Sequence, residues 1–141
     1  MTGAIRATAI ERLQAVNDAI ERGDRDGFRR LVDELMHPEA EWIPLITAVE
    51  GRGYRGHDGV MDFYDDLAGS FGVSYTDTEF RTVGDSAVLA LENMHLRGHE
   101  SEIEAVYEIG VLYEFDGDRV RRAQVYESQA EAIAAAEALV A

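Results

Sequence analysis

Residues 102–115, EIEAVYEIGVLYEF, alternate apolar and polar side chains almost without interruption. Successive side chains of a β-strand point to opposite faces of the sheet. The spacing therefore predicts one long strand with a buried face and a largely acidic face in solvent. The residues expected on the buried face are Ile103, Ala105, Tyr107, Ile109, Val111, Tyr113 and Phe115.

The preceding run, residues 87–97, is expected to pair with this strand through a turn at Gly98–Ser101. One set of its alternate residues consists of Val88, Ala90, Glu92, Met94 and Leu96. If this set faces inward, Glu92 is a carboxylate inside an apolar cavity, where burial raises its pKa and suits it to acid–base catalysis. Two alternatives remain open: a buried ion pair with Arg121, and a register that leaves Glu92 in solvent.

The rest of the chain predicts a single α+β domain over residues 1–141. Apolar spacings of three and four, with glycine, proline and capping residues at the ends, indicate helices over 5–22, 25–36, 57–70 and 129–140. Strands are expected over 41–46, 73–83, 86–97, 101–116 and 119–127, and a loop or short irregular strand over 47–56. We expect a strongly curved antiparallel sheet that wraps over the three N-terminal helices, followed by the C-terminal helix.

Composition excludes several classes of function. The 141 residues include 28 acidic and 13 basic side chains, a net charge of −15, which disfavours binding to nucleic acid or to an anionic membrane. The chain has no cysteine, so it has no disulfide and no thiolate nucleophile. No apolar run is long enough for a membrane span and the first residues do not resemble a signal peptide, so we expect a cytoplasmic protein.

Four short patterns carry a family resemblance. They are HPEAEW at 37–42, YRGHDGV at 54–60, FDGDRV at 115–120 and AEAI at 130–133. With the order of elements, they make the whole chain similar to the SnoaL-like branch of the NTF2-like superfamily, which implies a cone-shaped α+β barrel around one pocket. That superfamily includes ketosteroid isomerases, polyketide cyclases, limonene-epoxide hydrolases and dehydratases, as well as members that only bind ligands or dimerise.

Two mechanisms of the superfamily do not fit this chain. The Arg and two Asp residues of the epoxide hydrolases correspond here to Glu92, Met94 and Val125, so that triad is absent. The ketosteroid isomerases need a tyrosine in a helix, and the first two predicted helices contain none. The polyketide cyclases of the family use a pocket acid to move a proton, and the resemblance implies that Glu92 or Glu127 could serve in this role.

Candidate site residues follow from the predicted inward faces. Glu92 and Tyr107 are the predicted catalytic residues, since a tyrosine hydroxyl can hold a carbonyl or enolate oxygen. The predicted ligand-binding residues are Trp42, Tyr64, Met94, Tyr113, Val125 and Glu127. An alternative for Glu127 is a structural ion pair with Arg121.

No metal site or cofactor is expected. His95 and His99 have a spacing that suits a metal only on a helix, and here they flank a turn. The glycines at 51, 53 and 56 match a dinucleotide fingerprint in spacing, but no βαβ unit surrounds them.

The sequence therefore predicts a protein with a pocket for a small apolar molecule, open near residues 44–56. It could be a cofactor-free isomerase, cyclase or dehydratase acting on a small apolar carbonyl compound, or a non-catalytic ligand-binding or dimerisation module. A homodimer is expected through the outer face of the sheet, where Leu89, Leu91, Val106 and Leu112 interrupt the polar pattern. The glutamates at 102, 104, 108 and 114 share that face and oppose such an interface.

Overall fold

The computed structural model describes residues 3–45, 53–98 and 104–141. The helices in these ranges include α1 (Gly3–Arg22), α2 (Arg25–Leu35), α4 (Gly56–Ser70) and α5 (Gln129–Val140). The strands are β1 (Met36–Ile43), β2 (Tyr54–Arg55), β3 (Phe71–Val83), β4 (Ala87–Gly98), β5 (Glu104–Asp116) and β6 (Arg119–Tyr126). The predicted elements are thus confirmed, while most of the predicted loop at 47–56 and the turn after Gly98 lie outside the described residues.

Capping and proline set the ends of the second helix. Asp24 is its N-cap, and the carboxylate accepts a hydrogen bond from the amide of Gly27 at 2.9 Å. The helix ends at Leu35, and Pro38 lies in the strand that follows at once. This strand therefore begins at Met36, five residues earlier than predicted.

The six strands form one sheet in the order β2-β1-β6-β5-β4-β3. Tight hairpins join β3 to β4 and β5 to β6, and the second turns at Asp116–Gly117 with Gly117 at a φ of +65°. The curved sheet is antiparallel, as expected, except that β1 pairs with β6 in parallel. These two strands are far apart in the chain, so no hairpin constrains their relative direction.

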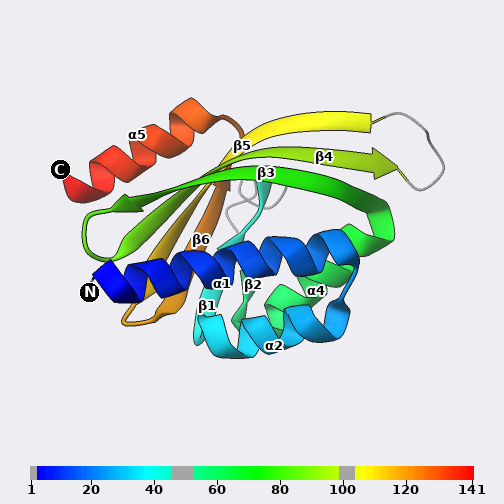
Figure 1. The fold of residues 1–141 in the computed structure, drawn as a ribbon, viewed down its shortest axis with the longest axis horizontal. Helices are drawn as coiled ribbons and strands as arrows, with labels where there is room; N and C mark the ends of the chain where they lie inside the picture. The colour runs from blue at the N-terminus through cyan, green and yellow to red at the C-terminus, as the bar shows by residue number, and fades with distance from the viewer. Residues whose placement is uncertain (1–2, 46–52, 99–103) are drawn as a thin grey trace.

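The helices cover both faces of the curved sheet (Figure 1). Helices α1, α2 and α4 lie on the concave side, and α5 lies on the opposite side. The larger core fills the space under the concave face and includes Leu13, Phe28, Leu35, Val88 and Val111. A second, smaller core lies between α5 and the outer face.

Helix α5 covers much of the surface predicted to dimerise. Leu89, Leu91 and Leu112 are each buried, and they pack with Ala132 and Ala136 in the smaller core. Val106 is the exception among the four predicted residues, since its exposed fraction is 55%. A homodimer remains a prediction, but an interface made by these leucines would first require α5 to leave the sheet.

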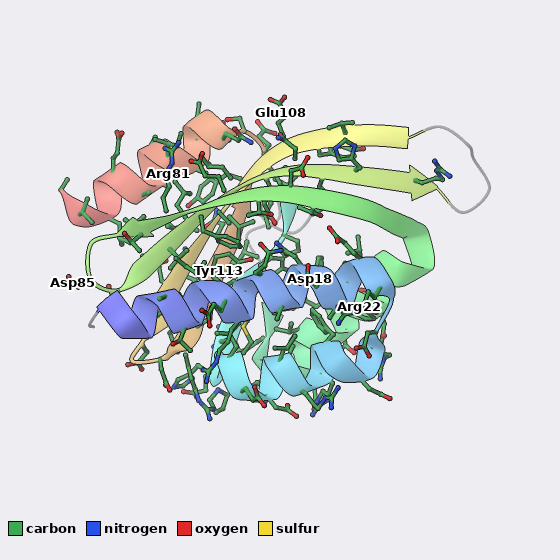
Figure 2. All side chains as sticks on the ribbon, in the orientation of Figure 1. Asp18, Arg22, Arg81, Asp85, Glu108 and Tyr113 are labelled. Carbon is green, nitrogen blue, oxygen red and sulfur yellow. The ribbon has the colours of Figure 1, made fainter. Side chains whose placement is uncertain are left out.

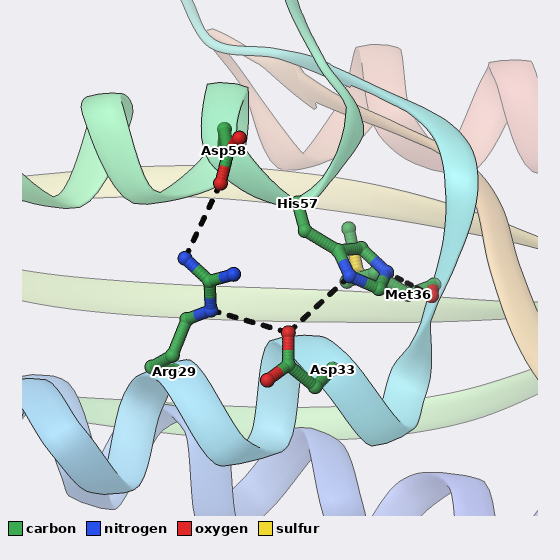
Figure 3. Close-up of polar contacts among 5 residues, drawn as sticks. All are labelled: Arg29, Asp33, Met36, His57 and Asp58. Atoms are coloured by element: carbon green, nitrogen blue, oxygen red, sulfur yellow. Dashed lines mark hydrogen bonds and ion pairs between the residues drawn. The ribbon is translucent and has the colours of Figure 1, made fainter.

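A polar network joins α2, β1 and α4 at the edge of the larger core (Figure 3). His57 Nε2 donates a hydrogen bond to the carbonyl oxygen of Met36 at 2.7 Å, and its Nδ1 lies 3.3 Å from Asp33 Oδ1. Arg29 contacts both Asp33 and Asp58, at 3.2 and 3.3 Å. The start of α4 is thereby attached to the end of α2, which helps to define one wall of the concave side.

Replacing His57 by alanine is expected to lower the free energy of unfolding by about 1–2 kcal/mol, because the partly buried carbonyl of Met36 loses its donor. Replacing Asp58 by alanine removes only an ion pair whose carboxylate side chain is 93% exposed, so it should change stability much less. Urea unfolding of the two variants provides the comparison. Equal effects would contradict a structural role for His57.

Candidate ligand-binding site

A cavity of about 360 Å³ lies between the concave face of the sheet and the three helices α1, α2 and α4. Its wall is mostly aliphatic and aromatic, with Asn17, Thr76, Glu92, Tyr107 and Tyr113 as its main polar contributors. Among the described residues that line it, there is one carboxylate and no lysine, arginine or histidine. As far as the described residues go, the cavity is thus an apolar chamber with a single carboxylic acid and no cation to balance it.

Glu92 lies on β4 with an exposed fraction of 4%. It is paired across the sheet with Thr78 of β3 on one side and with Ile109 of β5 on the other. Thr78 Oγ1 donates a hydrogen bond to Glu92 Oε1 at 3.4 Å, and Asn17 Nδ2 from α1 donates to Thr78 Oγ1 at 3.1 Å. The predicted burial of Glu92 is confirmed.

The surroundings of Glu92 change its ionisation. Burial raises the pKa of the carboxyl from 4.5 to about 7, and hydrogen bonds from Thr78 and Asn17 limit the rise. The alternative of an ion pair with Arg121 is not formed, because Arg121 Nη1 donates instead to the carbonyl oxygen of Glu39. Glu92 can therefore exchange a proton near neutral pH.

Tyr113 on β5 lines the same cavity and is 9% exposed. Burial, with a contribution from the negative charge of Glu92, raises the pKa of its phenol well above 10. The hydroxyl therefore stays protonated throughout the range in which Glu92 titrates. Figure 2 shows Tyr113 inside the molecule, whereas Glu108 of the same strand points away from the core on the other face of the sheet.

Four more predicted residues line the cavity. Tyr107 lies opposite Met94 in the sheet and is 45% exposed, so it belongs to a more open part of the wall than Tyr113. Trp42 packs on Phe63 with ring centroids 5.1 Å apart, and within the described ranges its buried indole N–H has no hydrogen-bond partner. Met94 and Val125 complete the set.

Two predicted ligand-binding residues lie elsewhere. Tyr64 packs against Phe28 in the larger core, with ring centroids 4.6 Å apart, and is not part of the cavity wall. Glu127 is exposed, because β6 ends at Tyr126 and Ser128 then caps α5 by accepting a hydrogen bond from the amide of Glu131 at 3.1 Å. The chain has therefore left the concave face at Glu127, and the Arg121–Glu127 pair is not formed.

Sequence reasoning missed the two partners of Glu92. The hairpin turn after Val83 pairs Val83 with Ala87, and counting outward from it places Thr78 opposite Glu92. That signal was available in the sequence. Asn17 had no comparable signal, because only the packing of α1 across β3 brings its amide to Thr78.

The predicted opening near residues 44–56 is only partly described. Pro44 and Leu45 line the cavity, and residues 46–52 lie outside the described ranges. Within the described ranges, no group of three or more His, Asp or Glu side chains is arranged to hold a metal ion. No helix in those same ranges has the length and apolarity needed to cross a membrane.

Fold and site together define an α+β protein with an apolar internal chamber and a buried acid. No family model matches the chain, and no curated protein matches its sequence. Solved structures do share the fold. One is a proposed isomerase from Bacillus subtilis, with a TM-score of 0.72 and 18% identity over 89% of this chain and 88% of that one.

A proposed polyketide cyclase from Xanthomonas campestris has a TM-score of 0.71 and 18% identity, over 94% of this chain and 98% of that one. A third structure is that of a protein from Catenulispora acidiphila with a ketosteroid isomerase-like fold, in complex with trimethylamine. It has a TM-score of 0.67 and 12% identity, over 90% of this chain and 92% of that one. The resemblance drawn from the sequence is confirmed at the level of fold: this chain has the fold of the NTF2-like superfamily.

Proposed function

We propose that the protein binds a small, neutral, mostly apolar carbonyl compound and moves a proton on it without a cofactor, as an isomerase, cyclase or dehydratase does. The observation that carries this proposal is the buried carboxyl of Glu92, the one carboxyl among the described lining residues, whose pKa of about 7 suits proton exchange near neutral pH. The absence of any cationic side chain among the described lining residues disfavours anionic ligands.

In the proposed reaction, ionised Glu92 takes a proton from the carbon next to the carbonyl group. The electron pair of the broken C–H bond forms an enolate, and Glu92 returns the proton to the same or another carbon. Tyr113 is the better candidate to hold the enolate oxygen, because its hydroxyl is neutral and shielded from solvent. Tyr107, the tyrosine favoured by the sequence, is proposed to contact the ligand at the more exposed end.

The experiment uses 2-tetralone, an apolar ketone with acidic protons beside its carbonyl. Exchange of these protons in heavy water, followed by proton NMR, is expected to be accelerated by the wild-type protein. The rate should rise with pH through about 7, as Glu92 ionises, and then level off. Glu92→Gln is expected to lose at least about 100-fold of the acceleration, since general base catalysis contributes on that order.

Glu108→Gln is the matched control, because Glu108 is an exposed glutamate on the neighbouring strand. It should exchange 2-tetralone at the wild-type rate. Acceleration that survives in Glu92→Gln would overturn the assignment of the base.

The rival function is a non-catalytic ligand-binding module. It is favoured by the position of Glu127 outside the cavity, which leaves Glu92 without a second carboxyl among the described lining residues. Under this proposal, the neutral dye N-phenyl-1-naphthylamine becomes fluorescent on binding and 2-tetralone displaces it, while exchange stays at the rate of the buffer.

A further inference from the structure

Two residues connect Glu92 to the frame of the molecule. Thr78 comes from β3 and Asn17 from α1, so a chain of two hydrogen bonds joins the carboxyl on β4 to these two elements. Thr78 is the direct cross-strand neighbour of Glu92, and its hydroxyl has only one proton to donate. Both residues lie on the concave side, and the proposed reaction assigns a role to neither of them.

We propose that Asn17 and Thr78 are positioning residues: Thr78 occupies Oε1 of Glu92 and Asn17 orients Thr78, so that Oε2 is the oxygen that exchanges protons with the ligand. This inference rests on the proposed function, in which Glu92 is the base. The inference goes beyond that function by naming the carboxyl oxygen of Glu92 that exchanges the proton and the two residues that select this oxygen.

The direction of the hydrogen bonds carries the argument. Asn17 Nδ2 donates to Thr78 Oγ1, so one lone pair of this oxygen is used and its proton is free to point at Glu92. Thr78 then donates to Oε1. The carbonyl oxygen of a neutral carboxylic acid is the better acceptor, so the bond at Oε1 favours the tautomer with the proton on Oε2. Asn17 thus keeps Thr78 in the role of donor to the carboxylate.

The charged surroundings do not compete with this arrangement. Burial raises the pKa of Glu92 and the hydrogen bonds of Thr78 and Asn17 lower it, and none of the described charged residues contributes. Tyr113 on β5 is the titratable group that senses the charge of Glu92, and its own pKa lies well above 10. Glu21 on α1 is engaged with the backbone amide of Thr76, at 2.5 Å, rather than with Glu92.

The test begins with the ionisation of Glu92, measured by NMR on protein carrying ¹³C-labelled glutamate and without any substrate. Thr78→Val keeps the shape of the side chain and removes the donor, so the pKa of Glu92 should rise by about one unit above the wild-type value. Thr78→Ser restores the hydroxyl and should return the pKa to the wild-type value. Asn17→Leu should raise the pKa as well, and by less when Thr78 is already valine.

Thr76→Val is the matched control, because Thr76 lies on the same strand and lines the cavity but donates its backbone amide to Glu21. It should leave the pKa of Glu92 unchanged. Infrared spectra below pH 6 give a second readout. The C=O stretch of protonated Glu92 should move to higher frequency in Thr78→Val, since its oxygen no longer accepts a bond, and should return in Thr78→Ser.

A pKa and a C=O frequency that stay at wild-type values in Thr78→Val would overturn the proposal, as would a serine variant that behaves like valine. Neither readout needs turnover, so they are separate from the exchange of 2-tetralone. If exchange fails but both shifts occur, the positioning holds and the proposed reaction does not. If exchange occurs but neither the pKa nor the C=O frequency of Glu92 shifts in Thr78→Val, Glu92 is the base and Asn17 and Thr78 do not position it.

Discussion

Replacing Glu92 by glutamine is expected to remove a pH-dependent loss of stability of roughly 3 kcal/mol. The unfolded chain releases the proton of Glu92 near pH 4.5, whereas the folded protein holds it until about pH 7. Between these pH values the folded state binds more protons than the unfolded state, so the free energy of unfolding falls as the pH rises. The stabilising contribution of protonated Glu92 is complete below pH 4.5 and is lost as the pH rises through 7. Glutamine does not titrate and stays neutral throughout.

The measurement is the free energy of unfolding in urea at pH 4.5, 6 and 8 for the wild-type protein and the variant. Only the difference between them is used, because the many other acidic groups titrate in both. This difference should move in favour of Glu92→Gln as the pH rises, and should be constant above about pH 8. Glu108→Gln should show no such trend, and a flat difference for Glu92→Gln would mean that Glu92 is not held neutral by burial.

The second large effect is expected at Gly110, where the outer face of β5 meets helix α5. A Cβ atom at this position would lie 2.2 Å from the Cβ of Ala132, closer than any real contact. Gly110→Ala therefore forces α5 away from the sheet and should cost about 1–3 kcal/mol, the usual effect of an overfilled core. Leu89, Leu91 and Leu112 lose part of their cover at the same time.

Urea unfolding measures the loss, and hydrogen exchange of the amides in α5 locates it. The control is a second substitution that gives the space back: Gly110→Ala combined with Ala132→Gly should recover part of the lost stability, after allowing about 1 kcal/mol for a glycine inside a helix. If Gly110→Ala alone is as stable as the wild type, the close approach of α5 to β5 is not a constraint on this fold.

Local patterns in the sequence were enough to predict most of the elements. The alternation in residues 102–115 made β5 recognisable, and the same reading of residues 87–97 put Glu92 in an otherwise apolar set that could face inward. Each prediction depended on a period of two or on a turn of a few residues. Both features are set by the geometry of the backbone and do not need the rest of the molecule.

The composition of the site depended on contacts between distant segments. Tyr64 was expected at the cavity and lies in the core, and Glu127 lies in solvent because the chain turns into α5. The leucines of the outer face were interpreted as a dimer surface, but α5 covers them, and Gly110 makes room for it.

The sequence by itself determined the α+β class, the strands and the one carboxylate among apolar neighbours, since these follow from side-chain periodicity along one segment. Only the tertiary structure decided that β1 runs parallel to β6 and that Asn17 and Thr78 hold Glu92. Asn17 and Thr78 are 61 residues apart, and they meet because α1 packs across the edge of a curved sheet. Such a contact results from the burial of whole faces, which no single segment encodes.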